Sequence, residues 1–243
     1  MVKVEVCAFS LESCLNAERA GAHRIELCSG PGEGGTTPSS GLVSLVKTKV
    51  SIPVYAMIRP RGGDFVYDEM EVETMLSEID ALKKIGVDGV VMGALRPDGT
   101  VDQELMKLLV EAAHPLGITF HRAFDVTSDP YRTMDFLVDL GIERILTSGL
   151  EANVDAGMGM LKKLVAYAKG RIEIMAGGGV RPSNVAELIG VGVDCIHLTA
   201  KSFRQGQQVY FPKKVSMTSE IPDERSVMYS DPTLLKQVVD LIH

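Results

Sequence analysis

Tryptophan is absent from this chain of 243 residues, and aromatic residues make up only 5% of it. Surfaces that bind nucleic acids combine basic side chains with aromatic rings on which bases stack. Here the formal net charge is −7, and no stretch of the sequence forms a basic stripe. We therefore expect no nucleic acid partner.

Long apolar runs are missing as well. A membrane-spanning helix needs about 18 or more consecutive apolar residues, and the sequence contains no such run. The first residues, MVKVEV, do not form the apolar core of a secretory signal. We therefore expect no membrane partner and a protein that is not secreted.

Cysteine is scarce, and the chain has four: Cys7, Cys14, Cys28 and Cys195. Thiols of proteins that are not secreted stay reduced, so metal binding or core packing is expected rather than disulfide bonds. Cys14 lies in a predicted helix and Cys195 begins a predicted strand. We interpret both as structural.

Strand-like and helix-like segments alternate along the chain. The expected strands are 3–8, 24–29, 53–59, 89–95, 118–124, 144–149, 172–177 and 195–200. Helical spacing of apolar residues separates them, for example at Leu105, Leu108, Leu109 and Ala112. A glycine, an apolar residue and a polar residue precede every second strand, which indicates four copies of a two-strand unit. Residues 1–243 are therefore predicted to form one α/β domain, a (β/α)8 TIM barrel, with a doubly wound open sheet as the alternative.

One segment interrupts this alternation. Residues 203–229 separate the eighth strand from the last helix, at 231–243, and have no clear periodicity. Irregular segments of this length in compact domains are usually functional or mobile. We expect a lid over the barrel mouth, an arm that contacts another subunit, or a plain surface loop.

The first two strands each contain the pattern Glu-x-Cys. Alternate residues of a strand share a face, so Glu5 and Cys7 point one way, and Glu26 and Cys28 repeat the arrangement. Parallel neighbouring strands would place the two thiols side by side and the two carboxylates side by side. With a methionine nearby, at 57 or 175, these thiols form a soft ligand set that favours Cu(I). Ordinary buried cysteines are the alternative.

The same alternation turns further polar side chains into the barrel lumen, which is normally filled by Val, Ile and Leu. These are Glu5, Glu26, Arg59, His121 and His197. Buried charges need partners, so we predict an ion pair between Glu26 and Arg59 with His121 close by. The alternative is a wholly structural polar network.

Two loops could bind an anion. Gly177, Gly178 and Gly179 follow the seventh strand, and Thr199 and Ser202 follow the eighth. Loops after these two strands are the usual phosphate site of TIM barrels, although the glycines could also form a simple tight turn. An enzyme acting on a small anionic or phosphorylated metabolite would then use His121 as general acid or base. Arg59 and Arg61 would hold the anion, and Glu5 or Glu26 would orient or neutralise these cations.

Several stretches resemble the CutC copper-homeostasis family, and its animal branch most of all. They are EVC at 5–7, RIELCSG at 24–30, EGGTTPS at 33–39, MIRPRGGDF at 57–65, TFHRAFD at 119–125, LTSG at 146–149 and GGG at 177–179. The resemblance implies a TIM barrel, a homo-oligomer (a dimer or a tetramer), and a cytoplasmic location with the nucleus as a second one. It also implies one Cu(I) per subunit, with Cys7 and Cys28 as the ligands.

We therefore expect a cytosolic copper-homeostasis protein with no assigned catalytic activity. Its alternative is the TIM-barrel enzyme of unassigned reaction described above. A third hypothesis is a scaffold for assembly, based on residues 203–229 as the contacting arm.

Overall fold

The computed structural model describes residues 2–212 and 224–242 of the chain. Eight parallel strands form a closed barrel in chain order, and β8 pairs with β1 to close it. The strands are β1 (Lys3–Ala8), β2 (Arg24–Leu27), β3 (Val54–Met57), β4 (Gly89–Met92), β5 (Gly117–Phe120), β6 (Arg144–Thr147), β7 (Glu173–Gly177) and β8 (Cys195–Leu198). The predicted single-domain TIM barrel is confirmed, and the open sheet is excluded.

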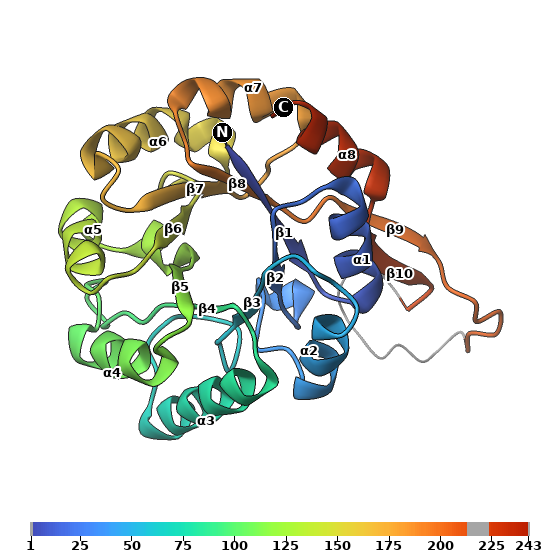
Figure 1. Cartoon of the computed structure of the whole chain (residues 1–243), viewed down its shortest axis with the longest axis horizontal. Helices are drawn as coiled ribbons and strands as arrows, with labels where there is room; N and C mark the ends of the chain where they lie inside the picture. The colour runs from blue at the N-terminus through green and yellow to red at the C-terminus, as the bar shows by residue number, and fades with distance from the viewer. Residues whose placement is uncertain (1, 213–223, 243) are drawn as a thin grey trace.

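Helices form a ring around the barrel (Figure 1). They are α1 (Leu11–Ala20), α2 (Ser40–Lys47), α3 (Glu69–Ile85), α4 (Gln103–Ala113), α5 (Pro130–Asp139), α6 (Val154–Ala168), α7 (Pro182–Val191) and α8 (Pro232–Asp240), with short 3-10 helices η1 (Pro31–Glu33) and η2 (Arg122–Val126). In the described ranges, no helix is long and apolar enough to cross a membrane.

Local sequence signals set the helix ends. Asp129 and Asp231 each cap a helix that begins with proline, because their side chains accept hydrogen bonds from free backbone N–H groups. Gly21 ends α1 and Gly192 ends α7, both in the left-handed conformation that glycine adopts without strain. These start and stop signals set where the four helices begin or end, in agreement with the predicted alternation of strands and helices.

Six of the eight predicted strands end earlier than expected, and two of these endings bear on the site. β3 ends at Met57 and β5 at Phe120, so the predicted strands 53–59 and 118–124 were too long. His121 caps η2, its ring nitrogen accepting from the N–H of Ala123. Arg59 and His121 therefore lie on loops at the carboxyl ends of the strands, where TIM barrels carry their sites.

The segment after β8 is partly regular. β9 (Lys201–Gln205) and β10 (Ser226–Ser230) pair as an antiparallel hairpin outside the ring of helices (Figure 1). β10 is attached to α1, because Asn16 donates to the carbonyl of Ser230, and the N–H of Ser230 donates to Ser13. The predicted irregular segment, 203–229, is therefore regular where it overlaps β9 and β10. Its residues 213–223 lie outside the described part of the chain.

The core has two layers. Apolar side chains fill the space between the barrel and its helices, and the inward-facing side chains of the strands fill the lumen. Glu5, Glu26, Thr119 and Arg144 are all buried there. The lumen is thus polar, as predicted, and its charges need partners inside the barrel.

Gly149 and Gly157 bring α6 close to the end of β6. A Cβ atom added to Gly157 would lie 1.8 Å from the carbonyl oxygen of Ser148, whereas one added to Gly159 would meet nothing within 4 Å. Gly157→Ala should therefore lower the free energy of unfolding by about 1–3 kcal/mol through overpacking. Gly159→Ala, on the same helix, should be neutral or stabilising by up to about 1 kcal/mol. Denaturant unfolding measures both, and equal effects would contradict this packing.

Candidate functional site

The two thiols meet as predicted. Cys7 on β1 and Cys28 just after β2 are both buried, and their sulfur atoms lie 4.0 Å apart. The strand register places Cys7 opposite Glu26. Cys28 follows Glu26 by two residues, so it lies nearer the carboxyl ends of the strands than Cys7 does. Met57 and Tyr55 on β3 pack against the pair.

The two carboxylates do not lie opposite each other in the strand register. Glu5 lies opposite Arg24 and forms a buried ion pair with it. Arg24 shares the inward face with Glu26 and Cys28, and this alternation was the sequence signal that could have revealed it. Burial opposes ionisation of Glu5, but the charge of Arg24 and a hydrogen bond to His197 outweigh it and hold the pKa of Glu5 at about 2.

The predicted ion pair between Glu26 and Arg59 is wrong. Arg59 lies beyond the end of β3, and its guanidinium donates to the carbonyl oxygens of Glu33, Gly35 and Gly63. These contacts turn it toward neighbouring loops. Among the described residues, no carboxylate lies within ion-pair distance of its buried charge. Glu26 instead accepts from the Cys28 thiol at 3.5 Å.

His197 on β8 connects the two carboxylates. Its Nδ1 lies 2.8 Å from Glu5, and its Nε2 lies 3.6 Å from Glu26. Burial opposes protonation of this imidazole, but the negative groups around it, Glu26, Cys7 and Glu5, raise its pKa well above the ordinary value. The ring is held as a cation between three strands.

This environment shifts the pKa values of the two thiols in opposite directions. The hydrogen bond to Cys28 lowers the pKa of Cys7 to about 5 despite burial, and the protonated His197 adds to this effect. Burial and the neighbouring Cys7 raise the pKa of Cys28 and of Glu26 well above their ordinary values. One thiolate, at Cys7, therefore faces the cation of His197.

His121 is buried and neutral. Burial and the nearby charge of Arg59 lower its pKa to about 3. Its Nδ1 accepts from the N–H of Ala123, so the proton is on Nε2, which has no hydrogen-bond partner among the described residues. Burial disfavours the charged form that a general acid would need near neutral pH. Its Nε2–H can serve as a hydrogen-bond donor.

A cavity of about 580 Å³ opens at this end of the barrel, a size typical of small-molecule sites. Its lining includes Cys7, Glu26, Arg59, His121 and His197. Buried polar atoms without a partner are rare in native proteins. Three of them belong to residues of this lining: Glu26 Oε1, Arg59 Nε and His121 Nε2. The cavity therefore offers hydrogen bonds that nothing in the described chain uses.

The predicted anion loops also reach the cavity. Gly178, Gly179 and Thr199 line it, whereas Gly177 and Ser202 do not. Within the described ranges, the N–H groups of Gly178 and Gly179 have no acceptor. Both glycines have positive φ, at 98° and 85°, so this stretch is an open turn of backbone donors.

Three further cations border these loops, Arg122, Arg181 and Lys201, and none of them was among the predicted site residues. Arg122, which carries an ion pair with Asp125, packs against Gly178. Lys201 on β9 lines the cavity together with Met228 on β10. The hairpin thus contributes to the rim, as expected for a lid. Arg61 does not line the cavity, because Glu71 and Asp64 hold it on the outer side.

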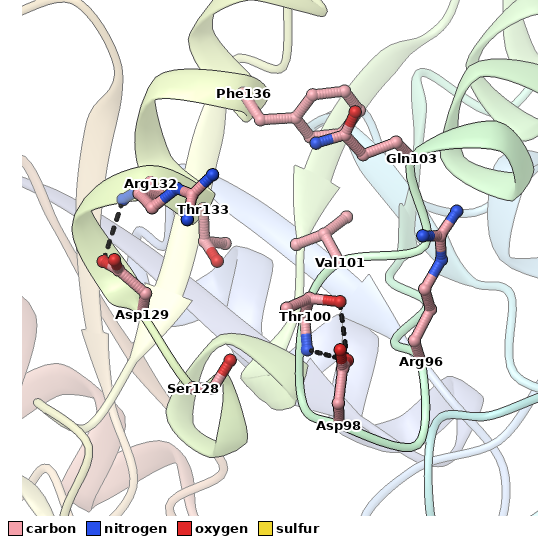
Figure 2. Close-up of a pocket in the computed structure, with 10 residues that line it drawn as sticks. All are labelled: Arg96, Asp98, Thr100, Val101, Gln103, Ser128, Asp129, Arg132, Thr133 and Phe136. Atoms are coloured by element: carbon pink, nitrogen blue, oxygen red, sulfur yellow. Dashed lines mark hydrogen bonds between the residues drawn. The ribbon is translucent and has the colours of Figure 1, made fainter.

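A second, smaller cavity of about 370 Å³ lies between the loop before α4 and the start of α5 (Figure 2). Its polar side chains are occupied locally. Asp98 accepts from Thr100, and Asp129 caps α5 (Figure 2). The cavity carries none of the predicted site residues.

The fold and the site together define a TIM-barrel protein with a thiol pair, a carboxylate and a histidine at its carboxyl mouth. The CutC family model matches residues 2–202. The chain belongs to the CutC family.

Similar proteins agree with this assignment. The chain is 45% identical to the human copper homeostasis protein cutC homolog over 235 residues, which is 96% of this chain and 86% of that protein. A structure of CutC from Streptococcus agalactiae covers 82% of this chain and 99% of its own, at 37% identity and a TM-score of 0.79. Phosphoribosylanthranilate isomerase from Thermotoga maritima shares only the fold, at 15% identity and a TM-score of 0.58 over 99% of this chain and 97% of its own.

The ionisation of Cys7 can be measured directly. We expect the ultraviolet absorbance of its thiolate to appear with a midpoint near pH 5. Cys28→Ala removes the hydrogen bond and should move the midpoint up by more than one pH unit, toward about 8.5, the value of a free thiol. Cys14→Ala is the control, since burial raises the pKa of Cys14 to about 12. A midpoint that Cys28→Ala leaves unchanged would contradict this arrangement.

Proposed function

We propose that the protein acts in copper homeostasis by binding Cu(I) through Cys7 and Cys28. The observation that carries this proposal is the 4.0 Å separation of two buried sulfur atoms at the base of an open cavity. Soft thiolate ligands select Cu(I) over harder ions. The names of the human and mouse relatives support the same function.

The remaining sulfur atoms fit this assignment. Cys14 lies on α1, and Cys195 clusters with Leu146 and Met175 elsewhere in the lumen. Two cysteines therefore converge, which suits an ion that accepts few ligands better than a four-cysteine zinc site. Met57 packs beside the pair and is a third soft donor within the same cluster.

Location and assembly follow from the family resemblance. We propose a cytoplasmic protein, present also in the nucleus, that forms a dimer or a tetramer with itself. Light scattering of the full chain measures the mass in solution and decides between these states and a monomer.

The copper ligands can be tested by substitution. A Cys7→Ser, Cys28→Ser variant should lose affinity for Cu(I) by more than about a hundredfold, because even changes outside the ligand shell cost about 10–100-fold. The measurement is a titration of reduced protein against a competing Cu(I) chelator. A Cys14→Ser, Cys195→Ser variant removes the same number of thiols and should bind like the parent. Parent-like binding by the first variant would refute the ligand assignment.

A second function, that of an enzyme acting on a small anionic metabolite, is favoured by one observation. Arg59 is a buried cation whose described partners are backbone carbonyls and the ring of Phe65, and its Nε has no hydrogen-bond partner. A buried charge without a counter-charge is unfavourable, so an anion in the cavity would stabilise it. His121 Nε2–H and the N–H groups of Gly178 and Gly179 offer further donors to such a ligand.

Binding of an anion can be read from thermal stability. We expect glycerol phosphate, inorganic phosphate or glycolate to stabilise the parent, by about 2.7 kcal/mol at a hundredfold excess over Kd. Arg59→Met should abolish the shift in melting temperature. Arg61→Met removes a neighbouring cation that does not line the cavity, so its shift should persist. Equal shifts in both variants, or none in the parent, would rule out this anion site.

A further inference from the structure

A second ligand set overlaps the thiol pair. Cys7 on β1, Glu26 on β2 and His197 on β8 each direct a donor atom to one point, and these atoms lie within 4.8 Å of one another. All three residues are buried. Closure of the barrel produces this meeting, because β1 pairs with β2 on one side and with β8 on the other.

We propose that Cys7, Glu26 and His197 bind a divalent ion of the zinc type, at a site that shares one sulfur with the copper pair but does not use Cys28. One sulfur, one nitrogen and one carboxylate oxygen form a mixed set that suits borderline ions. Three protein ligands with one open position are the arrangement of catalytic zinc sites, whereas structural sites use four.

The second coordination shell is already in place. Histidines that bind metals usually donate their other ring N–H to a carboxylate, which fixes the tautomer and orients the ring. His197 does this through Nδ1, which lies 2.8 Å from Glu5. Arg24 holds the other oxygen of Glu5 in an ion pair. The Nε2 of His197 is thereby directed at Glu26, 3.6 Å away.

The open position faces the cavity. Cys7, Glu26 and His197 all line it, whereas Cys28 is fully buried and does not. Glu26 Oε1 is buried without a hydrogen-bond partner among the described residues. A cation at the shared point would be reached from the cavity and would give this oxygen a partner. On binding, the metal would displace the proton from Nε2 of His197 to solvent, while Nδ1–H stays on Glu5. It would also leave one coordination position for a ligand that enters from the mouth.

Cobalt(II) is the probe, because it occupies zinc sites and absorbs visible light when its coordination is tetrahedral. Reduced, metal-free parent should develop these bands, with a sulfur-to-cobalt charge-transfer band, at one equivalent. Cys28→Ser should retain both. Cys7→Ser should lose the charge-transfer band, and His197→Gln should bind at least about tenfold more weakly. Glu5→Gln, a change in a positioning residue, should weaken binding by about 10–100-fold with unchanged bands.

These outcomes separate this site from the copper pair. We expect Cu(I) binding to require Cys28 as a ligand and Co²⁺ binding to require His197 as a ligand, whereas His197 affects Cu(I) only by favouring the Cys7 thiolate, so either proposal can fail alone. Circular dichroism checks that each variant is folded. If His197→Gln does not fold, X-ray absorption of the cobalt-loaded parent reads the ligands without substitution. One sulfur with nitrogen and oxygen donors is expected; two sulfurs, or no cobalt bound, would overturn the proposal.

Discussion

The buried Glu5 carboxylate is the group on which the rest of the site depends. It accepts hydrogen bonds from Arg24 on one neighbouring strand and lies 2.8 Å from His197 on the other. Because a buried carboxylate is tolerated only with such partners, its ion pairs tie together the three strands at which the barrel closes. The same contacts fix the ring of His197, and the cation of His197 then favours the thiolate of Cys7.

Charge neutrality explains how so polar a lumen can exist. Arg24 and Glu5 compensate each other, and His197 faces the thiolate of Cys7. Burial raises the pKa of Glu26, so its negative charge is held less firmly than that of Glu5. At the mouth the balance differs, because the charge of Arg59 meets carbonyl dipoles instead of a carboxylate. In the deep part the cations thus face negative groups and one acceptor, Glu26 Oε1, lacks a partner, whereas in the outer part donors of Arg59 and His121 lack acceptors.

Strand alternation controls the part of the site that the sequence predicts correctly. The inward faces of β1 and β2 depend only on parity, so the pattern of residues is enough to bring Cys7 and Cys28 together. The prediction for Arg59 was wrong because β3 ends at Met57, two residues before Arg59. Strand alternation does not apply beyond that end, so it could not give the direction of the Arg59 side chain.

The buried face of α4 was also predicted only in part. Its buried residues are Met106, Leu109 and Ala113, and Leu108 is exposed. Two adjacent faces of that helix have apolar residues at helical spacing, so the sequence pattern alone does not show which face is buried against the barrel.

Geometry at the mouth leaves room for the proposed copper site and the proposed anion site together. Cys28 lies behind the cavity wall, whereas Arg59, His121 and the glycine loop line its open part. An anion bound by these donors would not need to displace either sulfur. Because both positions lie on one cavity, the charge of a group bound at either would change the electrostatic potential at the other, with a sign set by the total charge of the metal and its ligands.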